Sequence, residues 1–326
     1  MSSRTLSDDA RRLADDVSGL TVVCVGQVTH DRYGDDLVAG GCACFGAMCA
    51  RALGARVRLL TSVGEDFQLD ASLAGLEVHA LRGGATTVFT NTYPEGGHRV
   101  QKVDAAAPPI PLAALPDAWR AADVLLLAPV FGELDLREPW LSAVDARVRA
   151  VCLQGFLKDA DPGSGIVRTA AEEKTRSQVT ALQVTALQTR SRVTALQTAL
   201  PTALPVTALR TGVDAIFLSE EDLACFGFPG LLDLLRAAAP LVFVTRGADG
   251  CDVFTPDGVL HVGVFPATAV DPTGAGDTFA AATACALACG RTPTQAARLG
   301  AAAASVVVGF EGSRDMPAVA RAWDLI

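Results

Sequence analysis

Residues 271–279 read Asp-Pro-Thr-Gly-Ala-Gly-Asp-Thr-Phe, and they carry the strongest chemical signal in the chain. The glycines on either side of Ala275 leave backbone N–H groups open to a closely bound ligand. The run from Thr278 to Gly290 contains no charged residue. It predicts a buried helix with Asp277 in its first turn. Free N–H groups at a helix N-terminus attract phosphate. The segment therefore predicts an anion site with a carboxylate beside it.

Composition limits the classes of protein that fit. The 326 residues suffice for one large domain, and half are hydrophobic, as expected of an α/β protein with buried parallel strands. The net charge of -9 argues against nucleic acid and anionic membranes as partners. No apolar run approaches the ~20 residues that span a bilayer, and residues 1–19 predict a polar tail. Nine cysteines, mostly in apolar segments, fit reduced thiols and a cytoplasmic location.

Apolar strand-like segments alternate with helical ones along the chain. Strands are predicted over Leu20–Val25, Arg56–Ser62, Asp123–Ala128, Arg149–Leu153, Asp214–Leu218 and Leu241–Thr245. Helices are predicted over Cys42–Leu53, Leu136–Val148, Glu221–Phe226 and Leu231–Ala239. This alternation predicts an α/β fold with a mostly parallel sheet and helices on both of its faces.

Two parts of the chain depart from this pattern. Glu77–Leu81, Thr86–Tyr93 and His98–Val103 are short β segments that alternate apolar and polar residues, which suits a small sheet covering a site. Between about 172 and 210 the unit Val-Thr-Ala-Leu recurs at irregular spacing, which predicts a low-complexity insertion rather than a solenoid. A tolerated surface insertion and a partner-binding helix both remain open for this segment.

Several common active-site motifs are missing. The chain has no Walker motif, no G-x-S-x-G elbow and only four scattered histidines. Cys42 and Cys44 lack the second pair or the nearby histidine that would complete a zinc site. The anion site and Asp277 therefore carry the chemical argument.

Residues 271–279 resemble the C-terminal signature of the ribokinase-like (PfkB) carbohydrate kinases. Gly40-Gly41 before a small-residue helix resembles the N-terminal signature of that family, residues 61–66 resemble its T-x-V-G-x-D segment, and residues 245–250 resemble its T-x-G-x-x-G nucleotide loop. The resemblance covers about residues 20–318 apart from the insertion. It implies a ribokinase-like three-layer α/β/α sandwich over 20–326, with a small β lid from residues 36–40 and 86–103.

The resemblance also implies an ATP-dependent kinase and a set of site residues. Asp277 would be the general base, and the backbone N–H groups of Gly274, Ala275 and Gly276 would stabilise the transferred phosphoryl group. ATP contacts are implied for Thr245, Gly247, Gly250, Thr273 and Gly309. Acceptor contacts are implied for Asp31, Gly40, Gly41, Phe45 and Gln154. Two other interpretations stay open: Asp277 could be only a helix cap, and Phe45 could be core packing.

The implied cofactors are ATP and Mg²⁺, with a monovalent cation such as K⁺ as a further candidate. Residues 219–222, Ser-Glu-Glu-Asp, align with the family's N-x-x-E motif, so Asp222 would support the metal through water. Ser219 is shorter than the family's Asn at this position. Asp271 could brace its loop or face a monovalent cation.

The acceptor is suggested by a finer resemblance to the myo-inositol kinases. The shared features are the pair His30-Asp31, the aromatic Phe45, residues 86–89 and Pro272. They favour a polyol such as inositol. A sugar or nucleoside kinase of the same family, and a catalytically weak binding or scaffold protein, are the alternatives. The expected assembly is a monomer or a homodimer formed through the lid.

Overall fold

The computed structural model describes residues 6–68, 73–92, 100–160, 164, 166–169, 209, 212–226 and 230–326. Nearly all of the insertion predicted at about 172–210 lies outside these residues, and so does the part of the predicted lid from 93 to 99. The insertion therefore stays a prediction.

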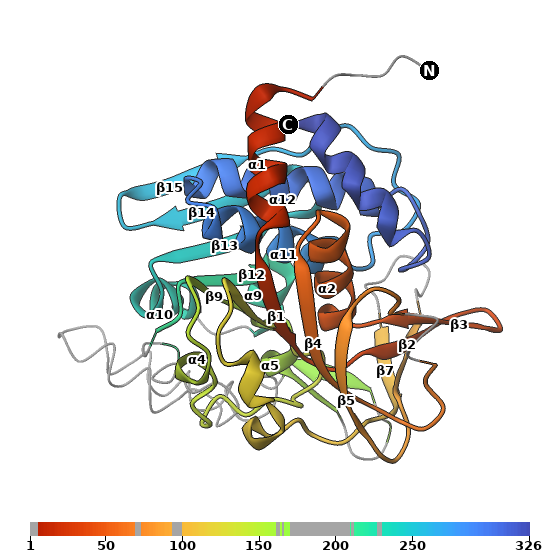
Figure 1. The fold of residues 1–326 in the computed structure, drawn as a ribbon. Coiled ribbons are helices and arrows are strands. Elements are labelled where there is room, and N and C mark those ends of the chain that lie inside the picture. The colour runs from red at the N-terminus through yellow and green to blue at the C-terminus, as the bar shows by residue number, and fades with distance from the viewer. Residues whose placement is uncertain are drawn as a thin grey trace, which may run out of the picture.

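A nine-stranded sheet forms the centre of the molecule (Figure 1). Its strand order is β15-β14-β13-β12-β9-β8-β1-β4-β5. The strands are β1 Thr21–Val25, β4 Arg56–Val63, β5 Glu77–Arg82, β8 Val124–Leu127, β9 Val148–Cys152, β12 Ala215–Ser219, β13 Leu241–Thr245, β14 Cys251–Thr255 and β15 Gly258–Val262. Neighbouring strands are parallel, except that β14 runs antiparallel to β13 and β15. The predicted α/β class with a mostly parallel sheet is confirmed.

Helices cover both faces of this sheet. Along β1, Val22 and Cys24 belong to the core under one layer, whereas Val23 and Val25 belong to the core under the other. The first layer holds α1 Asp8–Ser18, α2 Cys42–Ala52, α11 Ala275–Ala288, α12 Pro293–Val307 and η4 Met316–Leu325. The second holds η1 Leu112–Ala114, η2 Asp117–Trp119, α4 Trp140–Ala143, α5 Gln154–Leu157, α9 Glu220–Phe226 and α10 Leu231–Ala238. The result is the predicted three-layer sandwich.

A four-stranded sheet, called the small sheet below, lies beside the central one, toward the right in Figure 1. Its order is β3-β2-β6-β7, with β2 Thr29–Tyr33, β3 Asp36–Gly40, β6 Thr87–Thr92 and β7 Val100–Ala105. A hairpin of β10 (Lys158–Ala160) and β11 (Val167–Thr169) lies next to it, because Ile166 forms a bridge with Lys102 of β7.

The assignment of residues 77–81 to a small covering sheet is wrong. These residues form β5, which pairs in parallel with β4 and is an edge of the central sheet. An edge strand is only half covered, and the side chains of β5 alternate between exposed and half-buried. A lid strand is expected to alternate apolar and polar residues in the same way, so the periodicity of the sequence alone does not distinguish the two positions.

The helix predicted over 136–148 is reduced to a single turn, α4. Pro139 lies inside the predicted span and has no N–H to donate to a preceding turn. Just before it, the Asp135 carboxylate accepts the N–H of Arg137 at 2.9 Å, which closes a local turn. The residues before α4 therefore form turns and not the first part of the predicted helix.

Residues 8–18 form helix α1, although a polar tail is predicted for residues 1–19. The Ser7 hydroxyl caps this helix by accepting the N–H of Ala10 at 3.0 Å. Ala10, Leu13 and Val17 are buried, and the charged residues occupy the outer face. The tail prediction fails here because overall polarity hides an apolar stripe with helical spacing.

Helix α11 is buried along most of its length, as the uncharged run predicts. Ten of its residues are buried. A Cβ added to Gly300 of α12 would lie 2.3 Å from the Thr283 hydroxyl of α11, so the two helices pack this closely only with a glycine there. The middle of α11 is thus packed closely against α12.

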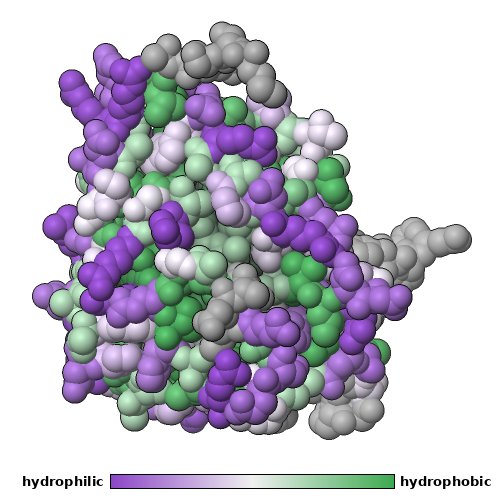
Figure 2. Space-filling view, turned by 45° about the vertical axis from the view of Figure 1, so that its right-hand side comes forward, coloured by the Kyte–Doolittle hydropathy of each residue, from purple (hydrophilic) through white to green (hydrophobic). Residues whose placement is uncertain are grey.

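The next feature is the distribution of hydrophobic residues over the surface and along the described helices. On the face shown in Figure 2, hydrophobic residues are interspersed among hydrophilic ones. None of the described helices is long and apolar enough to cross a membrane. Among the described residues, the large hydrophobic side chains that are exposed are Leu37, Ile166, Val259, Leu260, Val264 and Val270.

Candidate active site

The predicted anion site is the first turn of helix α11. Gly274 is its N-cap residue and has a left-handed φ of 78°. A Cβ on Gly274 would lie 2.2 Å from the ring of Phe45, so only glycine fits this turn. Phe45 itself is 1% exposed. Its ring therefore supports the turn from inside the core, as the core-packing interpretation expects, and its contact with an acceptor stays a prediction.

The first N–H groups of α11 differ in availability. The N–H of Ala275 donates to the Pro272 carbonyl at 3.2 Å, so one of the three predicted anion donors is already used. The first bond to a carbonyl one turn back is that of Thr278 to Gly274, at 2.9 Å. Gly276 precedes it and has no intrahelical acceptor. A Cβ on Gly276 would meet no atom within 4 Å, so the space beside its α-carbon is open.

Asp271 braces the loop before the helix. Its carboxylate accepts bonds from the Thr273 N–H at 2.9 Å and the Thr273 hydroxyl at 2.6 Å. The other oxygen accepts the Tyr33 hydroxyl at 2.6 Å and the Gly312 N–H at 2.9 Å. Burial opposes ionisation of Asp271, but these hydrogen bonds outweigh it and lower its pKa. The Thr273 hydroxyl, predicted to contact ATP, is thus held inside the loop.

Asp31 lies on β2 of the small sheet. Its Oδ1 accepts the Thr29 hydroxyl at 3.0 Å. A Cβ on Gly40 would lie 2.1 Å from Asp31 Oδ2, so the glycine makes room for this carboxylate. Gly41 has a φ of 89°, and a Cβ there would lie 2.8 Å from the Gln27 carbonyl. Both positions therefore require glycine, because the Asp31 carboxylate lies against Gly40 and the Gln27 carbonyl lies against Gly41.

The charges around Asp31 come from distant parts of the chain. Burial raises the pKa of Asp31 to about 6, and the carboxylates of Asp271 and Asp277 also raise it. Lys158 acts in the opposite direction. The ammonium of Lys158 lies 5.6 Å from the centre of the Phe89 ring on β6. The structure thus gathers three carboxylates and one ammonium between the small sheet and α11.

Cys42 links two predicted site residues. Its thiol lies 3.7 Å from the Gln154 side-chain oxygen and shares a hydrogen bond with the Asp277 carboxylate. Burial raises the pKa of the Cys42 thiol well above its usual range, and Asp277 raises it further. The thiol therefore stays protonated and can donate to either oxygen. Gln154, predicted as an acceptor contact, is thereby placed beside the predicted base.

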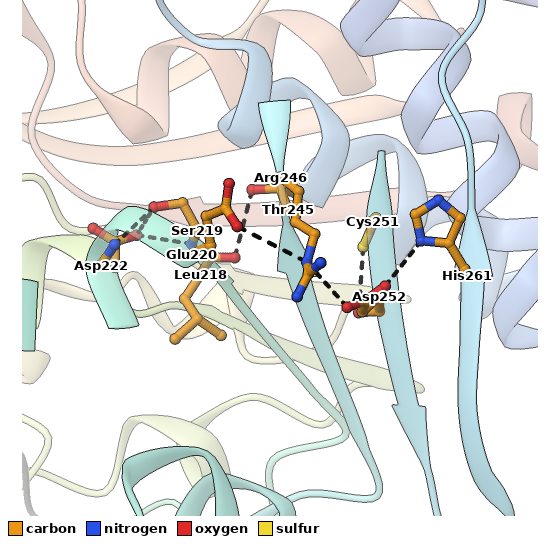
Figure 3. A network of polar contacts seen from close by, with 9 residues as sticks. All are labelled: Leu218, Ser219, Glu220, Asp222, Thr245, Arg246, Cys251, Asp252 and His261. Carbon is orange, nitrogen blue, oxygen red and sulfur yellow. Dashed lines mark hydrogen bonds and ion pairs between the residues drawn. The ribbon is translucent and has the colours of Figure 1, made fainter. Parts of the chain in front are cut away.

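The predicted nucleotide loop follows β13 (Figure 3). The Thr245 hydroxyl lies at the end of that strand, 3.5 Å from the Leu218 carbonyl. Gly247 opens the short helix η3 (Gly247–Asp249) with a φ of 54°. Gly250 follows with a φ of 91°, and a Cβ there would lie 2.2 Å from the Val262 carbonyl. Glycines are thus required to fold this loop back onto β15.

An ion-pair network holds the same loop from outside (Figure 3). Arg246 Nε lies 3.0 Å from Asp252 and 3.9 Å from Glu220. The other Asp252 oxygen lies 2.9 Å from His261 Nδ1 on β15. Because Arg246, Glu220 and His261 are about half exposed, solvent screens these pairs, and their main effect is on the orientation of the loop.

Gly309 lies beside the residue 271–279 motif. The N–H groups of Val270 and Asp271 donate to the Val308 carbonyl at 2.7 and 3.2 Å, which ties the motif to the end of α12. Val264 and Val270 are exposed to 48% and 64%. Exposed apolar side chains next to a backbone turn can cover a flat, apolar ring.

Asp222 has a local structural role. Its Oδ2 accepts the Ser219 N–H at 2.9 Å and the Ser219 hydroxyl at 2.8 Å, and its own N–H donates to the Ser219 hydroxyl at 3.0 Å. This reciprocal pattern is a capping box at the start of α9, and the sequence signal S-x-x-D could have identified it. Within the described ranges, no group of three or more His, Cys, Asp or Glu side chains could hold a metal ion. A water-mediated metal role for Asp222 stays a prediction.

Removing this cap should destabilise the protein. We expect Ser219→Ala to lower the free energy of unfolding by about 0.5–2 kcal/mol, because the first N–H groups of α9 lose their acceptor. Urea unfolding measures the change. Ser142→Ala is the control, since that exposed hydroxyl donates only to the Pro139 carbonyl. Equal stabilities of the two variants would contradict the capping role.

Two residues that the sequence does not mark as site residues, Tyr33 and Cys42, lie at this site. Tyr33 follows Asp31 by two residues, so strand alternation puts both on one face of β2. This spacing is a usable sequence signal, whereas the contacts of Cys42 depend on how distant elements pack. For Lys158, the sequence leaves pocket lining and capping of a strand end open, and the structure places it near Asp31.

A surface hollow elsewhere does not contribute to this site. It has a volume of about 530 Å³ and is lined by Arg51, Arg56 and Glu77, among others. Arg56 and Glu77 begin β4 and β5, so the hollow lies at the amino ends of these strands. Ligands of open α/β sheets bind at the carboxyl ends, where the motifs above meet.

Comparison with known proteins identifies the domain. Residues 164–319 match the family described as "pfkB family carbohydrate kinase". These residues carry the match to a PfkB-family carbohydrate kinase domain. The match to the PfkB family includes the loop 245–250, the 271–279 motif and Gly309. Asp31 and the Gly40-Gly41 pair lie outside the matched residues.

A curated relative supports the PfkB assignment over a short segment. Inositol 3-kinase of Zea mays is 52% identical over 59 residues, which is 18% of this chain. The match spans only 16% of that relative's length. The similarity therefore covers only a small part of either protein.

Solved structures agree with the fold over nearly the whole chain. A pyrophosphate-dependent kinase of the ribokinase family, complexed with a pyrophosphate analog and myo-inositol, is 18% identical, with a TM-score of 0.66 over 92% of this chain and 99% of that one. Fructokinase from Xylella fastidiosa with bound ATP is 17% identical, with a TM-score of 0.68 over 94% and 98%. The predicted ribokinase-like fold of the PfkB domain is confirmed.

Proposed function

We propose that this protein is a kinase that transfers the γ-phosphoryl group of ATP to a hydroxyl of a small polyol, with a myo-inositol-like acceptor favoured. One observation carries the proposal: Asp277 lies in the first turn of α11, next to the Gly276 N–H, which has no intrahelical acceptor, and it acts electrostatically on Asp31. A carboxylate beside an anion site is unfavourable unless it takes up a proton. In phosphoryl transfer, the acceptor hydroxyl supplies that proton.

Asp277 acts as the general base. Its carboxylate takes the proton of the acceptor hydroxyl while that oxygen bonds to the γ-phosphorus and the bond to the β,γ-bridging oxygen breaks. The first turn of α11, around Gly274, Ala275 and Gly276, provides the N–H groups and the positive end of the helix dipole for the transferred group. The products are the phosphorylated polyol and ADP, and Asp277 then releases the proton to solvent.

The donor is assigned to the surface between Thr245, Gly247, Gly250 and Gly309. The glycines let the backbone approach phosphates, and the exposed side chains of Val264 and Val270 suit an adenine ring. The described residues do not form a protein-held metal centre, so Mg²⁺ would arrive with the donor phosphates. No step of the mechanism depends on a resident ion.

A neutral acceptor suits the charges of the site. The carboxylates of Asp271 and Asp277 raise the pKa of Asp31, and the ammonium of Lys158 lowers it. The excess of negative charge disfavours acceptors that carry a phosphate or carboxylate. Carboxylates accept bonds from vicinal hydroxyls, so a polyol is the best match. The similarity to inositol 3-kinase over 59 residues supports the same choice.

The test is a panel of donors and acceptors. The purified full chain is incubated with Mg²⁺ and either ATP or pyrophosphate, together with myo-inositol, other polyols, sugars and nucleosides. We expect ATP-dependent phosphorylation of myo-inositol or a close analogue. Transfer from pyrophosphate alone would refute the donor assignment. ATP binding without transfer to any acceptor would favour the alternative, a catalytically weak binding or scaffold protein.

Acceptor use should depend on the ionisation of Asp31. Burial raises its pKa to about 6, so the carboxylate is ionised at pH 7.5 and protonated well below pH 6. Only the ionised form accepts two hydroxyl donors. We therefore expect kcat/KM for the acceptor to fall about tenfold per pH unit below pH 6. Asp31→Asn should remove this acid limb, and an unchanged limb in that variant would assign it to another group.

The small sheet is assigned the role of a lid. Its residues 36–40 and 86–103 would cover the acceptor and exclude water, which otherwise competes for the phosphoryl group. Strand β3 forms one edge of this sheet and exposes Leu37, which would suit contact with a second copy. A monomer or such a homodimer, located in the cytoplasm, is the expected form.

A further inference from the structure

Gln27 lies where the chain leaves the central sheet. It follows the end of β1 by two residues, precedes β2 by two, and is 2% exposed. The chain crosses between the central and small sheets in four places: residues 26–28, Gly41, residues 83–86 and residues 106–111. Gln27 belongs to the first crossing and contacts residues in or next to the other three.

The side-chain amide of Gln27 joins the two crossings that flank β6 and β7. Its Oε1 accepts the hydroxyl of Thr87, the first residue of β6, at 2.6 Å. Its Nε2 donates to the carbonyls of Ala107 and Pro108 at 2.9 and 3.0 Å and lies 3.2 Å from the Ser62 hydroxyl at the end of β4. Every polar atom of the buried amide therefore has a partner.

The backbone of Gln27 is tied to the body of the protein. Its N–H donates to Glu133 Oε1 at 2.8 Å. The same carboxylate accepts the N–H groups of Val130 and Phe131, at 2.9 and 2.8 Å, in the loop after β8. Burial raises the pKa of Glu133, while these bonds oppose the shift. The second crossing packs here too, since a Cβ on Gly41 would lie 2.8 Å from the Gln27 carbonyl.

We propose that Gln27 is a positioning residue that fixes the small sheet, and with it Asp31, relative to Asp277. Asp31 follows Gln27 by four residues on β2, whereas Asp277 belongs to α11 of the first helical layer. An acceptor held by Asp31 reaches the base only if β2 starts at the right place. The amide sets that place because it bonds carbonyls and a hydroxyl at once. This inference rests on the kinase function proposed above.

The isosteric variant Gln27→Glu tests the amide without changing its shape. An ionised carboxylate would face the carbonyls of Ala107 and Pro108, which it cannot bond. We expect at least a tenfold higher KM for the acceptor, with kcat reduced less than threefold. Once protonated, the introduced carboxyl group can again donate, so the ratio of mutant to wild-type KM should shrink as the pH falls from 8 to 6. Among the hydrogen-bond partners of Gln27, only Glu133 is titratable.

Hydrogen exchange provides a readout that needs no acceptor. In Gln27→Glu, amides of β2 and β6 should exchange at least tenfold faster, while those of β8 and β9 in the central sheet stay unchanged. Thr87→Val removes two hydrogen bonds of the cluster, the one donated to Gln27 and the one accepted from the Ala107 N–H, and should give the same pattern. Thr90→Val is its matched control, because that hydroxyl lies on the same strand and bonds only the side chain of Asp104.

The outcomes separate the possible failures. Uniformly faster exchange across both sheets would reduce Gln27 to a general contributor to stability and overturn the proposal. An unchanged acceptor KM in a variant with normal β2 exchange would overturn it as well. If the wild-type protein phosphorylates no acceptor, the kinase function fails, and the exchange experiment still decides whether Gln27 fixes the small sheet.

Discussion

Asp277→Asn is expected to lower kcat for the acceptor by about 10²–10⁴. An amide cannot take the proton of the attacking hydroxyl, yet it keeps the size of the carboxylate and can still cap the first turn of α11. Donor affinity should not decrease, because the substitution removes a negative charge beside the donor phosphates. Steady-state kinetics with the acceptor found in the panel, together with calorimetric titration of ATP, measures both quantities.

Asp233→Asn is the matched control for this variant. Asp233 is the third residue of α10, as Asp277 is the third residue of α11, and its carboxylate is exposed at the surface. Its replacement should leave kcat unchanged. If Asp277→Asn also turned over the acceptor at the wild-type rate, Asp277 would be a helix cap and the base would have to be another group.

Gly274→Ala should cost both stability and activity. Alanine is strained at a φ of 78°, and its Cβ would lie 2.2 Å from the Phe45 ring. Left-handed backbone costs about 1–2 kcal/mol and overpacking about 1–3 kcal/mol, so we expect a loss of about 2–5 kcal/mol in unfolding free energy. The N–H groups of the first turn should also shift, which lowers kcat by at least about tenfold. Urea unfolding and steady-state kinetics measure these changes.

Gly290→Ala separates backbone strain from the clash. Gly290 has a φ of 74°, and no atom lies within 4 Å of a Cβ built there. Its replacement should therefore cost only about 1–2 kcal/mol. Adding Phe45→Leu to Gly274→Ala should restore part of the lost stability, because the smaller side chain vacates the ring's position. Equal losses for Gly274→Ala and Gly290→Ala would show that the contact with Phe45 carries no energy.

Local sequence patterns explain why the helices and strands around the site were predicted correctly. The helix start at residues 274–277 depends on neighbours in sequence: two glycines, an acidic first turn and an uncharged run afterwards. The strand before Thr245 and the glycines after it behave in the same way. Helices α9 and α10 also end within one residue of their predicted bounds. In these places the backbone follows from residues one turn away.

The elements that were assigned wrongly depend on the strands and helices that pack against them. Strand β5 alternates apolar and polar residues as a lid strand would, and only its pairing with β4 places it in the central sheet. Helix α1 is polar by composition, and its buried stripe matters only because the domain offers an apolar surface to cover it. Phe45 could be wall or core from sequence, and packing against Gly274 makes it core. Pairing and burial are properties of the assembled chain.

Short contiguous patterns were enough to predict the fold class, the glycine-bounded start of α11 and the place of Asp277 in its first turn. Only the tertiary structure brought Asp31, Cys42 and Lys158 toward that carboxylate and joined the chain crossings at Gln27. Those contacts connect residues far apart in the chain. Their geometry is set by strand order and helix packing, which no local spacing encodes.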